Sequence, residues 1–396
     1  MATTKTSSTK SKTSTTLLPL FLIFLINLNL SESKLTLDFY KQTCPQFDEI
    51  IQQTVTSKQI QSPTTAAATL RLFLHDCLLP NGCDASVLLS STPFNKAERD
   101  NDINLSLPGD AFDLIVRIKT ALELSCPNTV SCSDILVTAT RDLLVMLGGP
   151  HFNVYLGRRD GRSSVSTAVN NFLPKPTMPM SQIIDIFAKR GFTVEEMVAL
   201  SGAHTVGFSH CSEISADIYN NSSNSGSYSS YNPRFVEGLR KACGDYKKNP
   251  TLSVFNDIMT PNKFDNVYFQ NLPKGLGVLK SDHGLFSDNL TKPFVERFAA
   301  DQDRFFKVFA SSMQKLSLLG VMTGRKAWWR WWCARSPEVW CTCKCKYFEA
   351  QVKELQNEVR MNAPTLLMRT RSAYSIADLF GRKTQFGLNF MVMMSD

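Results

Sequence analysis

The pairing of Arg71 with His75 is the feature of this sequence that most clearly could do chemistry. The two residues lie four positions apart, so on a helix they share one face, one turn apart. A neutral imidazole beside a permanent cation suits heterolysis of a peroxide bond, because the base takes a proton while the guanidinium stabilises charge on the departing oxygen. An arginine and a histidine at this spacing also occur on ordinary solvated helix faces, so the pair alone does not decide the function.

Oxygen-bearing residues follow this pair closely. Hard oxygen atoms, the ligand type that calcium requires, come within a few positions from Asp76, Gly82, Asp84 and Ser86. Cys77 and Cys83 could staple the loop that presents them. A polar turn would explain the same residues, but the string HDC…GCDAS together with the helix pair is highly specific.

A second histidine, His204, lies in the segment SGAHTVG, residues 201–207. Imidazole is a usual axial ligand of haem iron, and its basicity depends on what its other ring nitrogen contacts. Further along, Asp257 and Thr260 could hold a metal or simply cap a helix. The other histidines are expected to be structural, as lone histidines usually are, and they are His151, His210 and His283.

These motifs resemble the plant secretory peroxidases, called class III peroxidases, and the resemblance continues to about Cys333. It implies an all-α, mainly helical chain with the haem peroxidase fold, in which distal and proximal helical halves sandwich one haem b. It also implies that His75 is the distal acid–base catalyst and Arg71 the stabiliser of the transition state. Glu98 and Asn104 stand where the family places a hydrogen-bond chain to the distal histidine, which would leave one ring nitrogen free as a base.

On the proximal side, the resemblance implies that His204 is the axial ligand and that Asp282 accepts a hydrogen bond from it. A carboxylate there makes the imidazole more anionic and favours high-valent iron. Pro174 is the candidate contact for aromatic donors at the haem edge, although a proline could also serve only to make the loop rigid. Leu74 stands where the family usually has phenylalanine, which predicts more room above the iron and some oxygen transfer to thioethers.

Two calcium ions are implied as well. The distal ion would be held by Asp76, Gly82, Asp84, Ser86 and one main-chain carbonyl, and the proximal ion by Thr205, Asp257, Thr260 and Asp265. Cys77 and Cys83 enclose one residue more than is usual in the family, so the carbonyl ligand could be that of Leu79 or of Pro80. We expect weaker retention of the distal calcium for the same reason.

Eight of the eleven cysteines fit the four disulfides of the family, which are Cys44–Cys126, Cys77–Cys83, Cys132–Cys333 and Cys211–Cys243. Spacing alone cannot choose this connectivity among the many possible ones. Cys341, Cys343 and Cys345 form an odd set, so at least one of them is free, intermolecular or an artefact.

Helical periodicity dominates the rest of the chain. Apolar residues recur at helical spacing in many segments, for example at Phe112, Ile115 and Leu122, whereas the alternation typical of strands is scarce. Thr193 with Glu196 predicts a capping box at the start of a helix. We expect a signal peptide at residues 1–33, the peroxidase domain at 34–334 and an atypical extension at 335–396.

Three lysines ahead of an uncharged run too short for a comfortable membrane span are typical of a secretory signal peptide. Eleven cysteines fit an oxidising compartment. The sequence thus predicts secretion to the extracellular space or cell wall, with the vacuole as the alternative if residues 335–396 are a genuine sorting tail rather than a gene-model or splicing error. Sequons at Asn221 and Asn289 predict glycosylation, and the one at Asn104 is expected to stay unmodified in the pocket.

The formal net charge of +8 is too weak and too scattered for a nucleic-acid footprint, although it allows mild attraction to acidic cell-wall polymers. We expect a monomer with no membrane partner after signal removal. The predicted function is a secreted haem peroxidase that reduces hydrogen peroxide and oxidises phenolic small molecules by one-electron steps, in wall coupling, oxidative stress or peroxide removal. A catalytically silent wall-binding protein on the same scaffold is the alternative, and it would need none of Arg71, His75, Asn104, His204 and Asp282.

Overall fold

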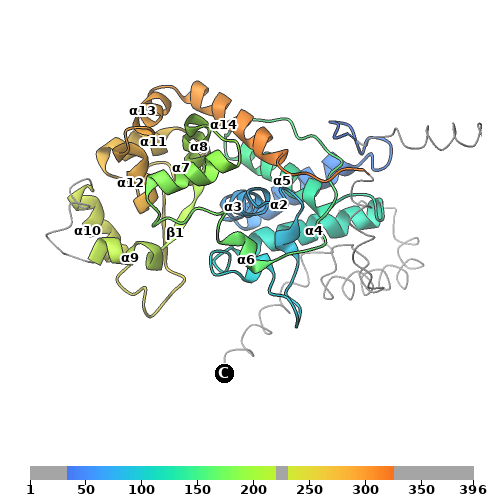
Figure 1. Cartoon of the computed structure of the whole chain (residues 1–396), viewed down its shortest axis with the longest axis horizontal. Helices are drawn as coiled ribbons and strands as arrows, with labels where there is room; N and C mark the ends of the chain where they lie inside the picture. Colours follow the sequence, from blue (N-terminus) through green and yellow to red (C-terminus); the bar gives the residue numbers. More distant parts are fainter. Residues whose placement is uncertain (1–33, 220–230, 325–396) are drawn as a thin grey trace, which may run out of the picture. The chain divides into compact units, whose positions relative to one another are not determined.

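The first group of helices is built from segments whose apolar residues recur at helical spacing. The computed structural model describes residues 34–219 and 231–324, all within one compact unit of the chain. Its first helices are α2 (Phe47–Gln61), α3 (Thr65–Cys77), α4 (Gly109–Ser125) and α5 (Cys132–Met146). They pack against one another, with α3 contacting both α4 and α5 (Figure 1). This packing buries α3 almost completely and gives its polar residues defined partners.

A second group of helices lies after residue 179 and is held by phenylalanine. It comprises α7 (Met180–Lys189), α8 (Val194–Ser201), α11 (Val267–Asn271), α12 (Lys280–Ser287), α13 (Lys292–Ala300) and α14 (Gln302–Ser317). Phe264, Phe269, Phe298, Phe305 and Phe309 are fully buried and contact one another through their rings. Helix α14 packs on α8 and also on α3, so it joins the two groups (Figure 1).

Short elements complete the described chain. They are α6 (Ser166–Val169), α9 (Cys211–Tyr219), α10 (Pro233–Ala242), the 3₁₀ turns η1 (Ser86–Leu88), η2 (Glu98–Asp100), η3 (Gly202–Val206) and η4 (Leu272–Lys274), and the strands β1 (Phe208–His210) and β2 (Ser253–Phe255). The two strands are antiparallel, with Phe208 opposite Phe255. A small separate core around Cys211 and Cys243 holds α9 against α10. The prediction of a mainly helical chain is confirmed.

Local signals in the sequence decide several helix boundaries. Helix α8 starts at the predicted capping box, in which Thr193 accepts from the N–H of Glu196 and Glu196 accepts from the N–H of Thr193. Helix α5 starts where the Ser131 hydroxyl accepts from the N–H of Asp134. Each side chain satisfies a backbone donor that the first helical turn leaves unpaired. None of the described helices combines the length and the apolar character that crossing a bilayer requires.

Disulfides tie distant segments of this fold together. The structure contains Cys44–Cys126, Cys77–Cys83 and Cys211–Cys243. Cys132 is also disulfide-bonded, while its expected partner, Cys333, lies outside the described residues. The predicted signal peptide, the extension at 335–396 with its three cysteines, and the sequon at Asn221 fall outside them as well. Asn289 is exposed on a loop, and Asn104 is buried, as their predicted glycosylation states require.

Candidate active site

Helix α3 presents Arg71 and His75 on one face. His75 is buried and Arg71 is half-buried, and the Arg71 Nε donates to His75 Nε2 over 3.4 Å. The same helix directs Leu72 and Phe73 into the core, where both are fully buried. Core packing on one side of α3 therefore fixes the direction of the two polar side chains on the other.

Asn104 determines which ring nitrogen of His75 carries the proton. Its Nδ2 donates to the main-chain carbonyl of Glu98 at 2.8 Å, so its Oδ1 must face His75, and this oxygen lies 2.6 Å from His75 Nδ1. An amide oxygen can only accept, so His75 Nδ1 carries the hydrogen and Nε2 keeps its lone pair, which accepts only the long contact from Arg71 Nε among the described residues. Glu98 thus joins the chain through its carbonyl, whereas its carboxylate accepts from the Ser86 hydroxyl at 2.8 Å.

The environment keeps His75 neutral. Burial and, to a smaller extent, the charge of Arg71 together lower its pKa to about 3, against the smaller raising effect of the Asn104 hydrogen bond. A histidine with so low a pKa is unprotonated at any physiological pH. His75 Nε2 is therefore available as a base.

The loop after η2 also anchors Arg71. The guanidinium donates to the carbonyls of Ile103 and Ser106, at 3.1 and 3.0 Å, and to the Ser106 hydroxyl at 2.9 Å. One loop thus orients both catalytic candidates, His75 through Asn104 and Arg71 through Ser106. Sequence reasoning gave Ser106 no such role, because a serine two residues after Asn104 carries no signal beyond the sequon.

His204 lies on η3, directly after α8. A Cβ at Gly202 would come within 2.6 Å of the Phe305 ring, so glycine is what allows this turn to pack on the phenylalanine cluster. His204 Nδ1 lies 2.8 Å from Oδ1 of the fully buried Asp282 on α12. Among the described residues nothing hydrogen-bonds to His204 Nε2, so its lone pair is free for a metal.

The Asp282 carboxylate is held by three donors. Besides His204, the Leu279 N–H donates to Oδ2 at 3.0 Å and the Tyr268 hydroxyl donates to Oδ1 at 2.8 Å. Burial would raise the pKa of Asp282, but the charge and hydrogen bond of His204 outweigh burial and hold it below its usual range. In His204, burial opposes the charged form, yet Asp282 raises the pKa overall.

The surroundings of His204 fit a haem. This imidazole lies deep among protein atoms, yet 36% of its side-chain surface is accessible. Both hold only if the ring faces an internal space. The charge of Arg71 acts on His204, and α3 contacts η3, so the two candidate groups border the same region. An open Nε2 backed by a carboxylate is the arrangement that haem iron uses for an axial histidine.

The predicted distal calcium residues gather near His75. Asp76, Asp84 and Glu98 are buried, and no Lys or Arg of the described chain pairs with them. Burial raises the pKa of Asp76 well above its usual range and that of Glu98 to about 7, and the charge of Asp84 adds to both. Buried carboxyl groups that repel one another and lack a basic partner fit a nearby cation, to which main-chain and hydroxyl oxygens would also have to bind.

Loop geometry at this place bears on the carbonyl ligand. The Leu79 carbonyl accepts from the Gly82 N–H and from the Arg190 guanidinium, which favours Pro80 over Leu79 as the carbonyl donor. Gly82 has φ +72°, and a Cβ there would overlap the Leu319 carbonyl, so only glycine fits. No three His, Cys, Asp or Glu side chains of the described residues form a metal site by themselves.

The predicted proximal calcium residues also lie together. Thr260 Oγ1 lies 3.2 Å from Asp257 Oδ2 and 3.1 Å from Asp265 Oδ1, so its one hydrogen can be donated to either carboxylate, and Thr205 Oγ1 lies 3.4 Å from Asp257 Oδ2. Asp265 Oδ2 is buried without a hydrogen bond, and the Lys263 ammonium near it, at 3.4 Å, is mostly exposed. Carboxylate and hydroxyl oxygens with one lone pair unused fit a calcium ion.

The remaining residues singled out from the sequence, Pro174 and three histidines, have fewer contacts that indicate a function. Pro174 is half-buried on the connection between α6 and α7. His151 is exposed near Arg141, and His210 lies on β1. His283 Nε2 lies 3.0 Å from the Gly277 carbonyl. The structure brings none of these three histidines into the arrangement around His75 and His204.

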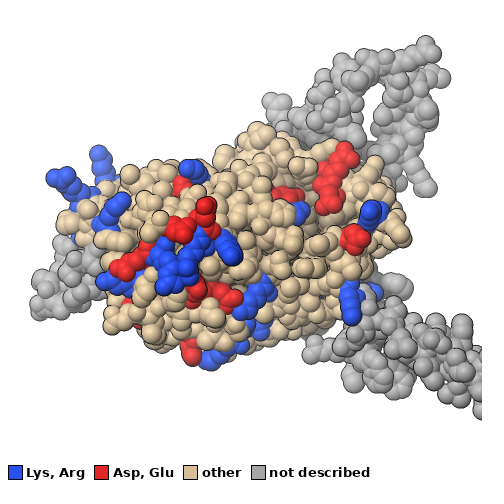
Figure 2. Space-filling view, turned by 90° about the horizontal axis from the view of Figure 1, so that it is seen from above, with Lys and Arg blue, Asp and Glu red and all other residues tan. Residues whose placement is uncertain are grey.

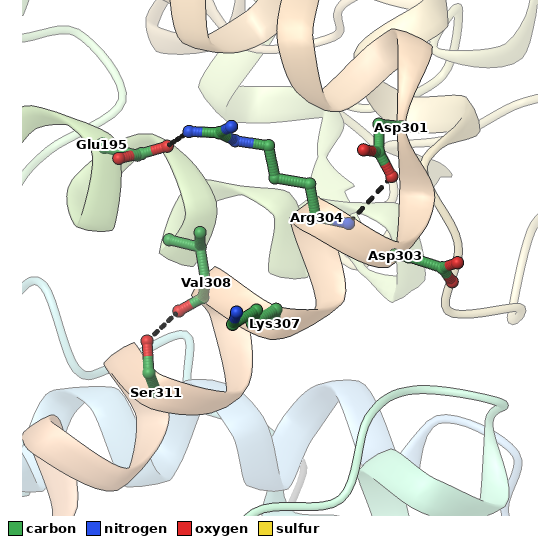
Figure 3. Close-up of a pocket in the computed structure, with 7 residues that line it drawn as sticks. All are labelled: Glu195, Asp301, Asp303, Arg304, Lys307, Val308 and Ser311. Atoms are coloured by element: carbon green, nitrogen blue, oxygen red, sulfur yellow. Dashed lines mark hydrogen bonds and ion pairs between the residues drawn. The ribbon is translucent and has the colours of Figure 1, made fainter.

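A separate charged pocket lies between α8 and α14. Figure 3 shows Glu195 reaching towards Arg304, at 3.0 Å, and Asp301 capping the N-terminus of α14. Its lining residues are Glu195, Asp301, Asp303, Arg304, Lys307, Val308 and Ser311, which include none of the residues discussed above. Figure 2 shows acidic and basic side chains intermingled on one face of the molecule, without a broad basic field.

Comparisons with known proteins agree with this site. A profile of the family "Peroxidase" matches residues 51–301. Peroxidase 63 of Arabidopsis thaliana is 64% identical over 296 residues, which are 75% of this chain and 88% of that protein. Peroxidase 31 of the same plant is 62% identical over 307 residues, 78% of this chain and 95% of that protein.

Proposed function

The chain belongs to the plant secretory, or class III, peroxidase family, and from this premise we propose that His75, Arg71 and Asn104 are its catalytic residues and His204 its haem ligand. The chain is a peroxidase enzyme, and its family implies a haem cofactor. The assignment of residues is supported mainly by the different groups that contact Nδ1 of the two imidazoles. His75 Nδ1 faces an amide oxygen, and His204 Nδ1 faces a carboxylate.

His75 and Arg71 would divide the work on hydrogen peroxide. His75 Nε2 takes the proton of one peroxide oxygen and passes it to the other, which leaves as water. The guanidinium of Arg71 has five N–H donors, of which the described residues engage four, so the fifth could stabilise the departing oxygen. When bound through His204 Nε2, haem would supply the site that accepts electrons from donors one at a time.

The overall reaction balances with two donors. Hydrogen peroxide gains two electrons and two protons to give two water molecules, and each of two phenolic donors loses one electron and its hydroxyl proton. Pro174 is our proposed donor contact at the haem edge. Asp282 would hold the proton on His204 Nδ1 and thereby keep Nε2 directed at the metal.

An optical spectrum of the purified protein tests this function. We expect a Soret band that shifts on addition of hydrogen peroxide and returns after a phenol is added. Folded protein that stays colourless after hemin is supplied would contradict it, and would favour a silent wall-binding protein. His204→Ala, which removes the proposed ligand, should lose the band of the wild-type protein, whereas His151→Ala, at an exposed site, should keep it.

We further propose two calcium ions. The distal ion would lie among Asp76, Asp84, Ser86, Gly82 and the carbonyl of Pro80, and the proximal ion would be bound by Thr205, Asp257, Thr260 and Asp265. What supports this is the buried carboxylates without cationic partners and the open oxygen of Asp265. Metal analysis before and after mild chelation should give about two calcium ions per chain, one lost first, and unchanged content after chelation would contradict the weak distal site.

The place of action is proposed as the extracellular space or cell wall, with the vacuole as alternative. Support comes from the predicted signal peptide and from the secreted character of the family. Mass spectrometry of the natural protein should find a mature N-terminus close to residue 34. Peptides beyond Cys345 should be absent if the extension is a gene-model error, and present if it is a sorting or partner-binding tail.

A further inference from the structure

One oxygen atom of Asp282 serves two donors. Oδ1 lies 2.8 Å from His204 Nδ1 and 2.8 Å from the Tyr268 hydroxyl. We propose that Tyr268 is a positioning residue that limits how strongly Asp282 draws the proton of His204. The proposal rests on the proposed role of His204 as a haem ligand.

Among the described residues, the Tyr268 hydroxyl has one hydrogen-bond partner, Asp282. The residue is 1% exposed on α11, and its ring stands edge-on to His204, with centroids 6.0 Å apart and an interplanar angle of 84°. An ionised carboxylate can only accept hydrogen bonds, so the phenol must be the donor. Helix α11 packs on η3, which keeps Tyr268 and His204 in place relative to each other.

Two donors on one oxygen share its negative charge. Among the described residues, Oδ2 accepts only the Leu279 N–H, at 3.0 Å, so Oδ1 is the atom at which His204 and Tyr268 compete. A hydrogen bond from Tyr268 therefore weakens the pull of Oδ1 on the His204 proton. Without the hydroxyl, the imidazole would become more anionic and a better donor to a ferric ion.

Tyr268→Phe in the haem-loaded protein tests this effect directly. We expect the iron–histidine stretching band of the ferrous protein to move to higher frequency in resonance Raman spectra. The equilibrium between ferric and ferrous iron should move towards ferric by about three- to tenfold, the range of one hydrogen bond. Incorporation of 3-fluorotyrosine at position 268, a stronger donor, should move both quantities the opposite way.

Tyr40 provides a matched control. Its hydroxyl donates to the buried Asp134 at 2.7 Å, and this pair shares no hydrogen-bond partner with His204, Asp282 or Tyr268 among the described residues. Tyr40→Phe should lose comparable stability but leave the iron–histidine band and the ferric–ferrous equilibrium unchanged. Shifts of equal size in both variants would reveal a general packing effect and overturn the proposal.

Other outcomes are equally decisive. Wild-type values in both position-268 variants, or a shift towards ferrous iron in Tyr268→Phe, would overturn it. If Tyr268→Phe fails to fold, the 3-fluorotyrosine protein decides alone, because it keeps the hydroxyl and nearly the same volume. Failure of the proposed function would look different, since the wild-type protein itself would then show no iron–histidine band.

Discussion

The regions around His75 and His204 each contain a histidine, but the proposed roles differ: His75 is the proposed base and His204 the proposed haem ligand. Both imidazoles are held through Nδ1, at 2.6 Å by Asn104 and at 2.8 Å by Asp282. The amide is neutral, and burial with the nearby Arg71 lowers the pKa of His75 to about 3, whereas the carboxylate raises that of His204. The surroundings of each imidazole, including the group that contacts its Nδ1, therefore distinguish the proposed neutral base from the proposed electron-rich ligand.

The two regions also differ in how their partners are supplied. The distal partners, Asn104 and Ser106, come from a single loop, whereas the proximal partners, Asp282 and Tyr268, come from helices α12 and α11. A loop can be altered without repacking a core, since it carries few buried apolar contacts. Substitutions on the distal side should therefore change chemistry with less loss of folding stability.

Removal of the proposed distal base, His75, should cause the largest loss of rate in the reaction with hydrogen peroxide. His75→Ala takes away the group proposed to move the proton, so the reaction with hydrogen peroxide should slow roughly 100- to 10,000-fold, the usual contribution of general acid–base catalysis. Stopped-flow absorbance in the Soret region measures this rate. His151→Ala is the control, and a His75→Ala protein within tenfold of the wild-type rate would contradict the assignment.

Replacing the amide that contacts His75 Nδ1 with a carboxylate should make the electrostatic surroundings of His75 resemble those of His204. Asn104→Asp places a carboxylate at Nδ1 and raises the pKa of His75. Wild-type His75 is neutral above about pH 3, so its rate should not depend on this group between pH 5 and pH 8. In the variant the base becomes protonated as the pH falls through the new pKa, and the rate should fall about tenfold for each further unit.

Asn104→Ala separates charge from geometry in this test. It removes the acceptor without adding a charge, so the rate of the peroxide reaction should fall at every pH. The pH below which this rate declines should stay the same as in the wild-type protein. A pH–rate profile of the peroxide reaction distinguishes the two variants. Identical profiles for Asn104→Asp and Asn104→Ala would argue that the charge of the Nδ1 partner is unimportant.

Ser106→Ala should have a smaller effect, through Arg71. The variant loses one of the hydrogen bonds that hold the guanidinium but keeps the carbonyls of Ile103 and Ser106 as acceptors. We expect the peroxide reaction to slow by about three- to tenfold, which corresponds to one hydrogen bond. The Michaelis constant for a phenol should not change, and Ser106→Thr should restore part of the rate.

Leu74→Phe should have the smallest effect, on access to the distal side. The half-buried Leu74 neighbours His75 on α3, and a larger ring should restrict access to the distal side. We expect thioether sulfoxidation to fall relative to phenol oxidation, measured on the same preparation. An unchanged ratio would show that residue 74 does not control access.

Several features could be predicted from the sequence alone: the shared face of Arg71 and His75, the mainly helical character of the chain and the capping box at Thr193. Each depends on the spacing of residues within one or two helical turns. The family resemblance also pointed to His204, Asp282 and Asn104 as candidate site residues. Only the tertiary structure decided that Glu98 acts through its carbonyl, that Ser106 holds Arg71 and that Tyr268 shares an oxygen with His204. The contacts of Ser106 and Tyr268 join residues 35 and 14 positions apart, and that of Glu98 lies within an irregular loop. Their geometry depends on how the helices and this loop pack, which local patterns do not record.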